Sequence, residues 1–172
     1  MLILAKSVLG LTLGFVLAIV IGIVLIPCLR KLKAGQSVSR LINKRHLKKE
    51  GTPTLGGLIF IIPPIIAIIL LALKGSIDIC SNLFIVLFVF ISYGLLGFVD
   101  DFMKIKYKNN KGLSVLTKLV AQIFIAVVFY TVYKHNGGTT ILEVSLINFE
   151  MDLKWFYGVF ILFLLVGSSN AV

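Results

Sequence analysis

The chain has 172 residues, of which 59% are hydrophobic and only 14% are charged, and its formal net charge is +10. A soluble domain usually carries about 25% charged residues, so this composition excludes a water-soluble globular protein. The excess of basic residues fits either a nucleic acid or a membrane surface, and the distribution of the charges decides between them.

The hydrophobic residues gather in runs that approach the ~20 residues needed to cross a bilayer. The predicted helices span about residues 7–29, 55–73, 83–99, 115–133 and 155–172. This pattern predicts an all-α polytopic membrane protein with about five transmembrane helices, in a single incomplete transmembrane domain over residues 1–172. Pro63 and Pro64 fall in the second helix, where we expect a kink that neighbouring helices stabilise.

The connections between these helices differ in charge. The predicted loops 30–54 and 100–114 are strongly basic, whereas lysines and acidic residues balance each other on the other side. Because Lys and Arg concentrate in cytoplasmic loops, we predict the N-terminus outside and the C-terminus inside. This asymmetry accounts for the net charge, so we expect the lipid bilayer as a partner and no nucleic acid. Cys28 and Cys80 fall on opposite faces in this topology and are expected to be free thiols.

The segment 134–154 is unlike the rest of the chain. Asn136-Gly137-Gly138 is a turn signal. Residues 139–149 are rich in β-branched and apolar side chains with partial alternation. We therefore predict a small extracellular β-hairpin between the fourth and fifth helices.

Asp100-Asp101 is the first candidate for chemistry. The pair falls at the cytoplasmic end of the third predicted helix, where the helix dipole and mutual repulsion oppose the ionisation of both carboxyls. We expect a compensating positive group, which is either a divalent cation or a lysine such as Lys104. The alternative is that two acids only mark a helix end in the headgroup region.

The segment Gly51–Gly57 leads into the second helix and is the second candidate. Thr52 fits an N-cap and Pro53 fits the first helical turn. The free amides and the positive end of the helix dipole also suit a phosphate. The alternative is a plain helix start whose glycines serve close packing.

Two polar residues near apolar runs complete the candidates. The positive-inside rule and contact with anionic lipids explain Lys106 and Lys108. Lys118 lies inside an apolar run and is expected to face a polar cavity. Asn170 offers a donor and an acceptor at a cavity rim, and its alternative is a fraying chain end.

Together these segments resemble the N-terminal half of the phospho-N-acetylmuramoyl-pentapeptide transferases (translocase I, the MraY family). That family belongs to the polyprenyl-phosphate N-acetylhexosamine-1-phosphate transferases. Its Gly-Thr-Pro-Thr-x-Gly-Gly element is specific within the superfamily, whereas the double aspartate is shared more widely. The matching segments are Leu29–Ser37, His46–Gly57, Gly97–Lys104, Lys111–Leu113 with Lys118, and Asn170–Val172.

The resemblance implies a Mg²⁺-dependent transfer in peptidoglycan synthesis at the cytoplasmic face of the bacterial inner membrane. UDP-MurNAc-pentapeptide would give its phospho-sugar to undecaprenyl phosphate, forming lipid I and releasing UMP. Asp100 would activate the lipid phosphate or place the metal, with Asp101 as its partner in catalysis and metal binding. The substrate-binding residues implied are Lys49, Thr52, Thr54, Lys104, Lys111, Lys118 and Asn170.

The resemblance also implies parts that this sequence does not contain. The family continues with further helices, another metal-binding aspartate and a histidine-rich cytoplasmic loop, and its full-length form is compatible with a homodimer. We therefore expect residues 1–172 alone to be inactive. Two alternatives stay open: a related transferase of another sugar phosphate to the same lipid carrier, and a non-catalytic membrane remnant.

Overall fold

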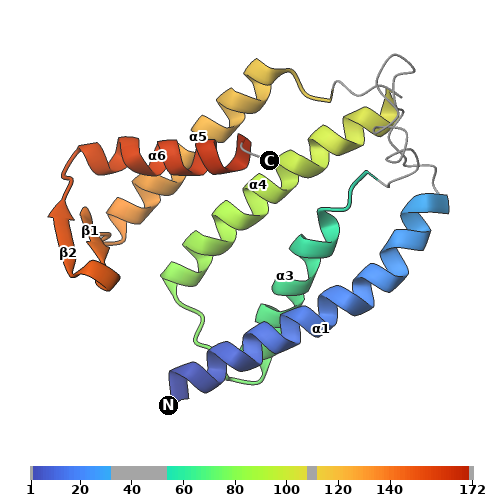
Figure 1. Cartoon of the computed structure of the whole chain (residues 1–172), viewed down its shortest axis with the longest axis horizontal. Coiled ribbons are helices and arrows are strands. Elements are labelled where there is room, and N and C mark those ends of the chain that lie inside the picture. Colours follow the sequence, from blue (N-terminus) through green and yellow to red (C-terminus); the bar gives the residue numbers. More distant parts are fainter. Residues whose placement is uncertain (1, 32–53, 108–111, 171–172) are drawn as a thin grey trace. The chain divides into compact units, whose positions relative to one another are not determined.

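The computed structural model describes residues 2–31, 54–107 and 112–170, which form a mostly helical chain (Figure 1). The helices are α1 (Leu2–Lys31), α3 (Leu58–Leu73), α4 (Ser81–Lys106), α5 (Val115–His135) and α6 (Phe156–Asn170). Two short strands, β1 (Ile141–Val144) and β2 (Phe149–Asp152), lie between α5 and α6. Every helix is rich in apolar residues, which is what a bilayer requires of its spanning elements.

The lengths of the helices separate them into two groups. Within the described residues, α1, α4 and α5 are the helices long and apolar enough to cross a membrane. The apolar helices α3 and α6 have 16 and 15 residues, which corresponds to roughly 22–24 Å at 1.5 Å per residue. The architecture is therefore that of a polytopic membrane protein, and the total of five spans stays a prediction.

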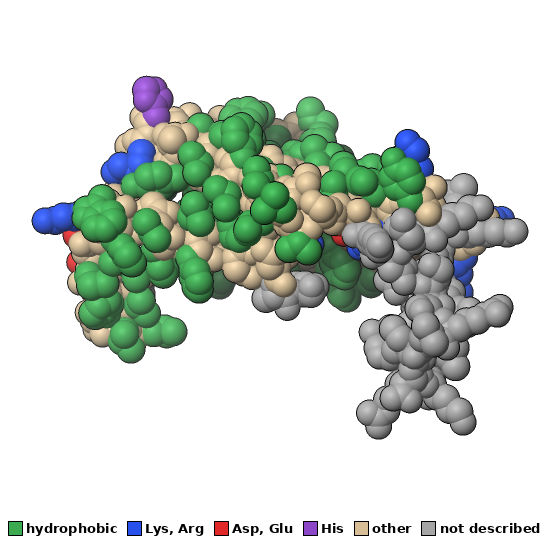
Figure 2. Space-filling view, turned by 90° about the horizontal axis from the view of Figure 1, so that it is seen from above, with side chains coloured by type: hydrophobic (Ala, Val, Ile, Leu, Met, Phe, Trp, Pro, Cys, Tyr) green, Lys and Arg blue, Asp and Glu red, His purple; other side chains and the backbone are tan. Residues whose placement is uncertain are grey.

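Hydrophobic side chains cover much of the surface, as Figure 2 shows for one face. Phe15, Phe60, Phe124 and Phe163 are between 65% and 75% exposed, and they lie on four different helices. A water-soluble protein rarely exposes apolar patches on this scale. The surface of these helices is therefore suited to lipid.

The third predicted helix is longer than expected. It was predicted to end near Val99, but α4 continues to Lys106. The sequence prediction stopped at the first charged residues. In α4 those charges pair with one another at i, i+3 and i, i+4 spacing, which stabilises a helix and adds a lysine near its negative end. Asp100 and Asp101 consequently lie inside the helix and not at its terminus, which corrects our prediction.

The second predicted helix begins later than expected. It was predicted to start near Leu55 with Thr52 as N-cap, but α3 starts at Leu58, and its N-cap is Gly57. Residues 54–57 form a turn in which Leu55 has a φ of +71°. A left-handed residue cannot continue a right-handed helix, so the helix begins only after the two glycines. Thr52 itself lies outside the described residues.

The contacts of the chain divide it into two compact units, Met1–Ile79 with Gly94–Leu113 and Cys80–Tyr93 with Ser114–Val172. In the first unit α1 packs on α3 through small residues. A Cβ added at Gly22 would lie 3.7 Å from Ile59, and one added at Gly94 of α4 would lie 2.9 Å from Ile61. Glycines let membrane helices approach closely where no hydrophobic effect drives them together.

The second unit packs α5 against α6. Gly158 of α6 faces the ring of Tyr130, where an added Cβ would lie 2.9 Å from the nearest ring atom. The rings of Tyr133 and Tyr157 stack with centroids 6.1 Å apart. Ala126 is almost completely buried in α5. A small residue on one helix therefore meets an aromatic ring on the other.

Strands β1 and β2 form an antiparallel pair between α5 and α6, with Val144 opposite Phe149. Paired residues share a face, so Leu142, Val144, Phe149 and Met151 form an apolar face and the acidic residues lie on the other. The turn signal at Asn136–Gly138 does not make the hairpin turn. It ends α5, where the amide of Gly138 donates to the carbonyl of Tyr133 and Gly137 has a φ of +80°, as in a glycine C-cap.

Candidate functional site

Two consecutive carboxylates of α4, Asp100 and Asp101, are each held by a backbone amide from another segment. The amide of Leu113 donates to Asp100 Oδ1 at 2.8 Å. The amide of Leu55 donates to Asp101 Oδ2 at 3.1 Å. A carboxylate that accepts a backbone N–H bond is stabilised in its ionised form and fixed in orientation. The segments before α3 and α5 therefore meet α4 at these two side chains.

Lys104 binds the other oxygen of each carboxylate. Its Nζ lies 2.7 Å from Asp100 Oδ2 and 3.0 Å from Asp101 Oδ1. The three side chains are 14% to 30% exposed, so solvent screens this cluster only in part. The ammonium is the positive group that the adjacent carboxylates were predicted to need.

Gly112 allows this cluster to close. Its φ is +54°, and an added Cβ would lie 2.5 Å from Asp100 Oδ1 and 2.9 Å from Lys104 Cε. Any larger residue would clash with the carboxylate and would also be strained. In the sequence, the role of Gly112 is signalled only by its being a glycine. The sequence analysis assigned it no role in the site.

Leu55 is the second residue that sequence reasoning missed. Its backbone lies in the left-handed region at φ +71°, a conformation that costs a non-glycine residue about 1–3 kcal/mol and is often kept at functional sites. This conformation directs its amide at Asp101. The neighbouring Thr54, a predicted substrate-binding residue, is 5% exposed.

The carboxylates suit a magnesium ion in chemistry and in number. Mg²⁺ is usually held by one or two carboxylates and completes its shell with water and substrate phosphates. Asp100 Oδ2 and Asp101 Oδ1 already share one cationic partner, the Lys104 ammonium. No group of three potential ligand residues lies together in the described part of the chain.

Two other predicted residues belong to the second unit. Asn170, at the end of α6, pairs its amide with Gln122 of α5 at 2.8 Å. Gln122 is 1% exposed, and it is a buried polar residue to which we had assigned no role. Lys118 is half-buried and lies one turn before Gln122, so the two residues share a face of α5. The predicted residues Lys49, Thr52 and Lys111 lie outside the described residues.

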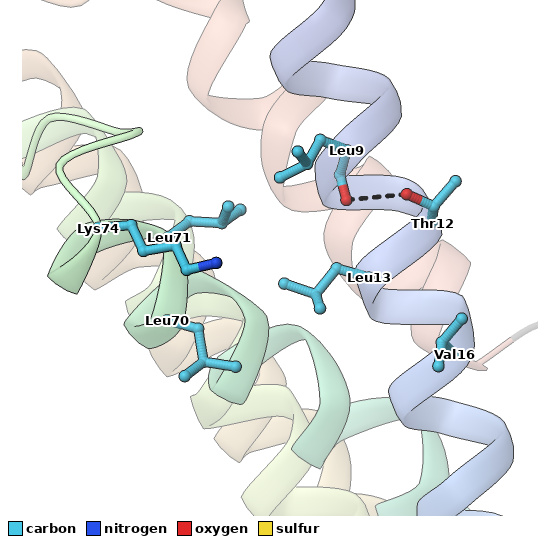
Figure 3. A pocket seen from close by; sticks show the side chains of 7 residues that line it. All are labelled: Leu9, Thr12, Leu13, Val16, Leu70, Leu71 and Lys74. Carbon is cyan, nitrogen blue, oxygen red and sulfur yellow. Dashed lines mark hydrogen bonds between the residues drawn. The ribbon is translucent and has the colours of Figure 1, made fainter.

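The groove between α1 and α3 is not lined by the carboxylates. It has a volume of about 450 Å³ and is lined mainly by leucines (Figure 3). Among its described lining residues Lys74 alone is charged, and its side chain points into the groove. The Thr12 hydroxyl donates to the Leu9 carbonyl at 3.1 Å. None of the predicted site residues that the structure describes lines this groove, and apart from Lys74 and Thr12 its described walls are apolar.

Comparison with known proteins places the chain in a family. Residues 83–172 match the family described as Glycosyl transferase family 4. The chain is 45% identical over 159 residues to the phospho-N-acetylmuramoyl-pentapeptide-transferase of Bacillus velezensis and 44% identical over 159 residues to that of Bacillus subtilis. It is 40% identical over 165 residues to that of Geobacillus thermodenitrificans.

These alignments cover 92% to 96% of this chain and 49% to 51% of the relatives. The chain therefore spans about half the length of the curated relatives it matches. The region that matches the family contains Asp100, Asp101, Lys104 and Asn170. The family predicted from the motifs is confirmed, and the chain belongs to glycosyl transferase family 4.

Proposed function

We propose that the protein transfers phospho-MurNAc-pentapeptide from its UDP-activated form to undecaprenyl phosphate, which yields lipid I and UMP. The matched relatives bear the name of this phosphosugar transferase. The observation that carries the proposal is the cluster of Asp100, Asp101 and Lys104 in the C-terminal part of α4. Because the chain spans about half of its relatives, the proposal concerns the product of the complete gene.

The proposed transfer exchanges one P–O bond for another. An oxygen of the lipid phosphate attacks the β-phosphorus of the UDP-sugar, and a new P–O bond forms. The bond between that phosphorus and the bridging oxygen breaks, and its electron pair leaves on UMP. Both reactants are anionic, so the rate depends on neutralising charge and aligning the phosphates.

The carboxylate cluster suits both tasks. Asp100 would accept the proton of the lipid phosphate or place the metal, and Asp101 would complete the metal site. Bound Mg²⁺ would supply neutralisation of the diphosphate charge. Lys104, once exchanged from the carboxylates, would bind a phosphate oxygen. The amides of Leu55 and Leu113 would keep both carboxylates oriented throughout.

The remaining assignments extend the same proposal. Lys49, Thr52, Thr54, Lys111 and Lys118 would bind phosphate or nucleotide on the cytoplasmic face of the bacterial inner membrane. Asn170 would contribute to the nucleotide pocket. These residues have in common a polar group that an anionic or a hydroxyl-rich substrate can use.

The proposal is tested by the identity of the product. Membranes from cells that express the complete gene are supplied with undecaprenyl phosphate and either UDP-MurNAc-pentapeptide or UDP-GlcNAc, and UMP release and the mass of the lipid product are measured. We expect product from the first nucleotide sugar only. Product from UDP-GlcNAc alone would contradict the proposal and favour a relative with another sugar specificity.

The same assay defines what this segment does in isolation. Purified residues 1–172 are expected to release no UMP above the level of empty membranes, because the relatives are about twice as long. Measurable UMP release from the isolated segment with both substrates would refute this expectation.

A further inference from the structure

Gln122 is a buried amide in a helix that is otherwise apolar. It is 1% exposed, and it lies on the face of α5 that carries the buried Ala126. A buried amide without hydrogen-bond partners is costly. The hydrogen bonds of its side-chain amide therefore stabilise it in this position. They are made with Ser169 and Asn170, in the last turn of α6.

The carbonyl oxygen of Val166 determines the direction of the hydrogen bonds in this cluster. Because a carbonyl can only accept, both Asn170 Nδ2 at 3.1 Å and the hydroxyl of Ser169 at 3.1 Å must donate to it. The Ser169 oxygen is then free to accept from Gln122 Nε2 at 2.8 Å. Gln122 Oε1 accepts the second hydrogen of Asn170 Nδ2 at 2.8 Å. The orientation of both amides follows from this order of donors and acceptors.

Among the described contacts, this arrangement leaves one hydrogen-bonding group of the Asn170 side chain available. A primary amide has two N–H donors and an oxygen with two lone pairs. Both hydrogens of Asn170 are occupied by Gln122 and Val166, and its Oδ1 accepts only a long bond of 3.3 Å from Gln122 Nε2. Asn170 is exposed. Its available group is therefore an acceptor, which cannot bond to an unprotonated phosphate oxygen.

We propose that Gln122 is a positioning residue that locks Asn170 as a hydrogen-bond acceptor for a donor group of the nucleotide. The donor is the 2′-O–H of the ribose or the N3–H of the base. This inference rests on the proposed function, in which Asn170 belongs to the nucleotide pocket, and it makes that role specific. Tyr93 supports the same turn of α5, because its hydroxyl donates to the Gln122 carbonyl at 3.1 Å.

The test measures equilibrium binding of uridine nucleotides to the purified product of the complete gene, so that it does not depend on turnover. Wild type is compared with Gln122→Met, which keeps the length of the side chain and removes its hydrogen bonds. Thr131→Val is the matched control, because Thr131 lies on the same helix and its hydroxyl donates to the carbonyl of Val128 in the preceding turn. UDP, 2′-deoxy-UDP and N3-methyl-UDP are the probes.

In wild type we expect one of the two altered nucleotides to bind about tenfold more weakly than UDP, since a lost hydrogen bond is worth roughly 1 kcal/mol or more. The position of the loss identifies the donor as the ribose or the base. Gln122→Met should weaken UDP binding about five- to tenfold and abolish this discrimination, because the amide of Asn170 is then free to rotate. Thr131→Val should behave as wild type.

Ser169→Ala is a second variant, which tests the inference if Gln122→Met does not fold. It removes one partner of Gln122 and should reduce the discrimination in part. Equal binding of all three nucleotides by wild type would overturn the inference, as would full discrimination in Gln122→Met. Wild type that binds UDP selectively but forms no lipid I would count against the proposed function and leave this inference supported.

Discussion

A single lysine side chain forms ion pairs with two adjacent carboxylates in the C-terminal part of α4. Asp100 and Asp101 would repel each other if both were ionised without a partner. Lys104 lies within 3.0 Å of each of them, and a backbone amide fixes the second oxygen of each one. These bonds fix the orientation of both carboxylates, and under the proposed function this would be the preorganisation that phosphoryl-type transfers need.

The role of Gly112 gives a prediction at this scale. Gly112→Ala should destabilise the protein by about 1–3 kcal/mol through backbone strain and should also disturb Asp100, because its Cβ would lie 2.5 Å from Oδ1. Gly75→Ala is the matched control, since Gly75 has a φ of +64° and no neighbouring atom within 4 Å. Thermal unfolding and UMP release of the complete gene product are measured for both variants.

Both alanine variants should lower the thermal midpoint, and only Gly112→Ala should reduce UMP release strongly, by at least about tenfold. Equal activity of the two variants would mean that the contact between Gly112 and Asp100 has no role in the reaction.

Residue types alone predicted part of this cluster. From the adjacent aspartates we expected a compensating positive group, either a divalent cation or a lysine such as Lys104, and Lys104 pairs with both carboxylates. The amides of Leu55 and Leu113 could not be predicted, because they depend on tertiary contacts and on a left-handed leucine. Leucine disfavours that conformation, so no propensity points to it. Gln122 was visible as a polar residue in an apolar run, but its partner on α6 was not.

At the scale of elements, the hairpin between α5 and α6 shows how a local signal was misplaced. The sequence predicted a turn at residues 136–138, and the structure uses it to end α5, whereas the chain reverses at residues 145–148 between the strands. Both a helix C-cap and a hairpin turn favour Asn and Gly. The pattern therefore predicted that the chain changes direction there but not which element it ends.

Asp152 ties this hairpin to the start of the next segment. The hydroxyl of Thr140 and then the amide of Lys154 donate to its carboxylate, and these bonds hold the pKa of Asp152 below its usual 3.8. A lowered pKa in the folded state adds stability that is present above pH 3.8 and is lost as the pH falls through the folded value.

We therefore expect the amide of Lys154 to be protected from hydrogen exchange at pH 6 and to lose part of its protection below pH 3. The exposed carboxylate makes the effect small. Asp152→Asn should remove this pH dependence. Glu150→Gln, on the same strand, should keep it, because the amide of Lys154 donates to Asp152. A pH dependence that persists in Asp152→Asn would assign it to another group.

At the scale of the whole molecule, we predict the orientation of the chain in the membrane, with the N-terminus outside and the C-terminus inside. Both cysteines are free and exposed, and the charge pattern places Cys28 on the cytoplasmic side and Cys80 outside. A membrane-impermeant thiol reagent added to intact cells should label Cys80 alone, and permeabilised cells should show labelling of both. Labelling of Cys28 alone in intact cells would invert the topology and would move the basic loops to the outer face.

The sequence predicted the class of this protein better than its boundaries. Long apolar runs made the membrane helices evident, because a bilayer enforces length and composition together. The start of α3 and the end of α4 differ from the prediction. The helix α3 begins only after Gly56 and Gly57, and paired charges extend α4 to Lys106. The family followed from the motif order and was confirmed by the relatives.

The most direct test of the account is the rate of UMP release by the complete gene product with Asp100 changed to Asn. This substitution keeps the shape of the side chain and its ability to accept from the Leu113 amide, but it removes the charge that a metal or a proton would use. We predict a fall of at least about 100-fold. Asp78→Asn, at an exposed residue between α3 and α4, should stay within about twofold of wild type. Wild-type activity in Asp100→Asn would contradict the assignment of the carboxylate pair as the catalytic centre.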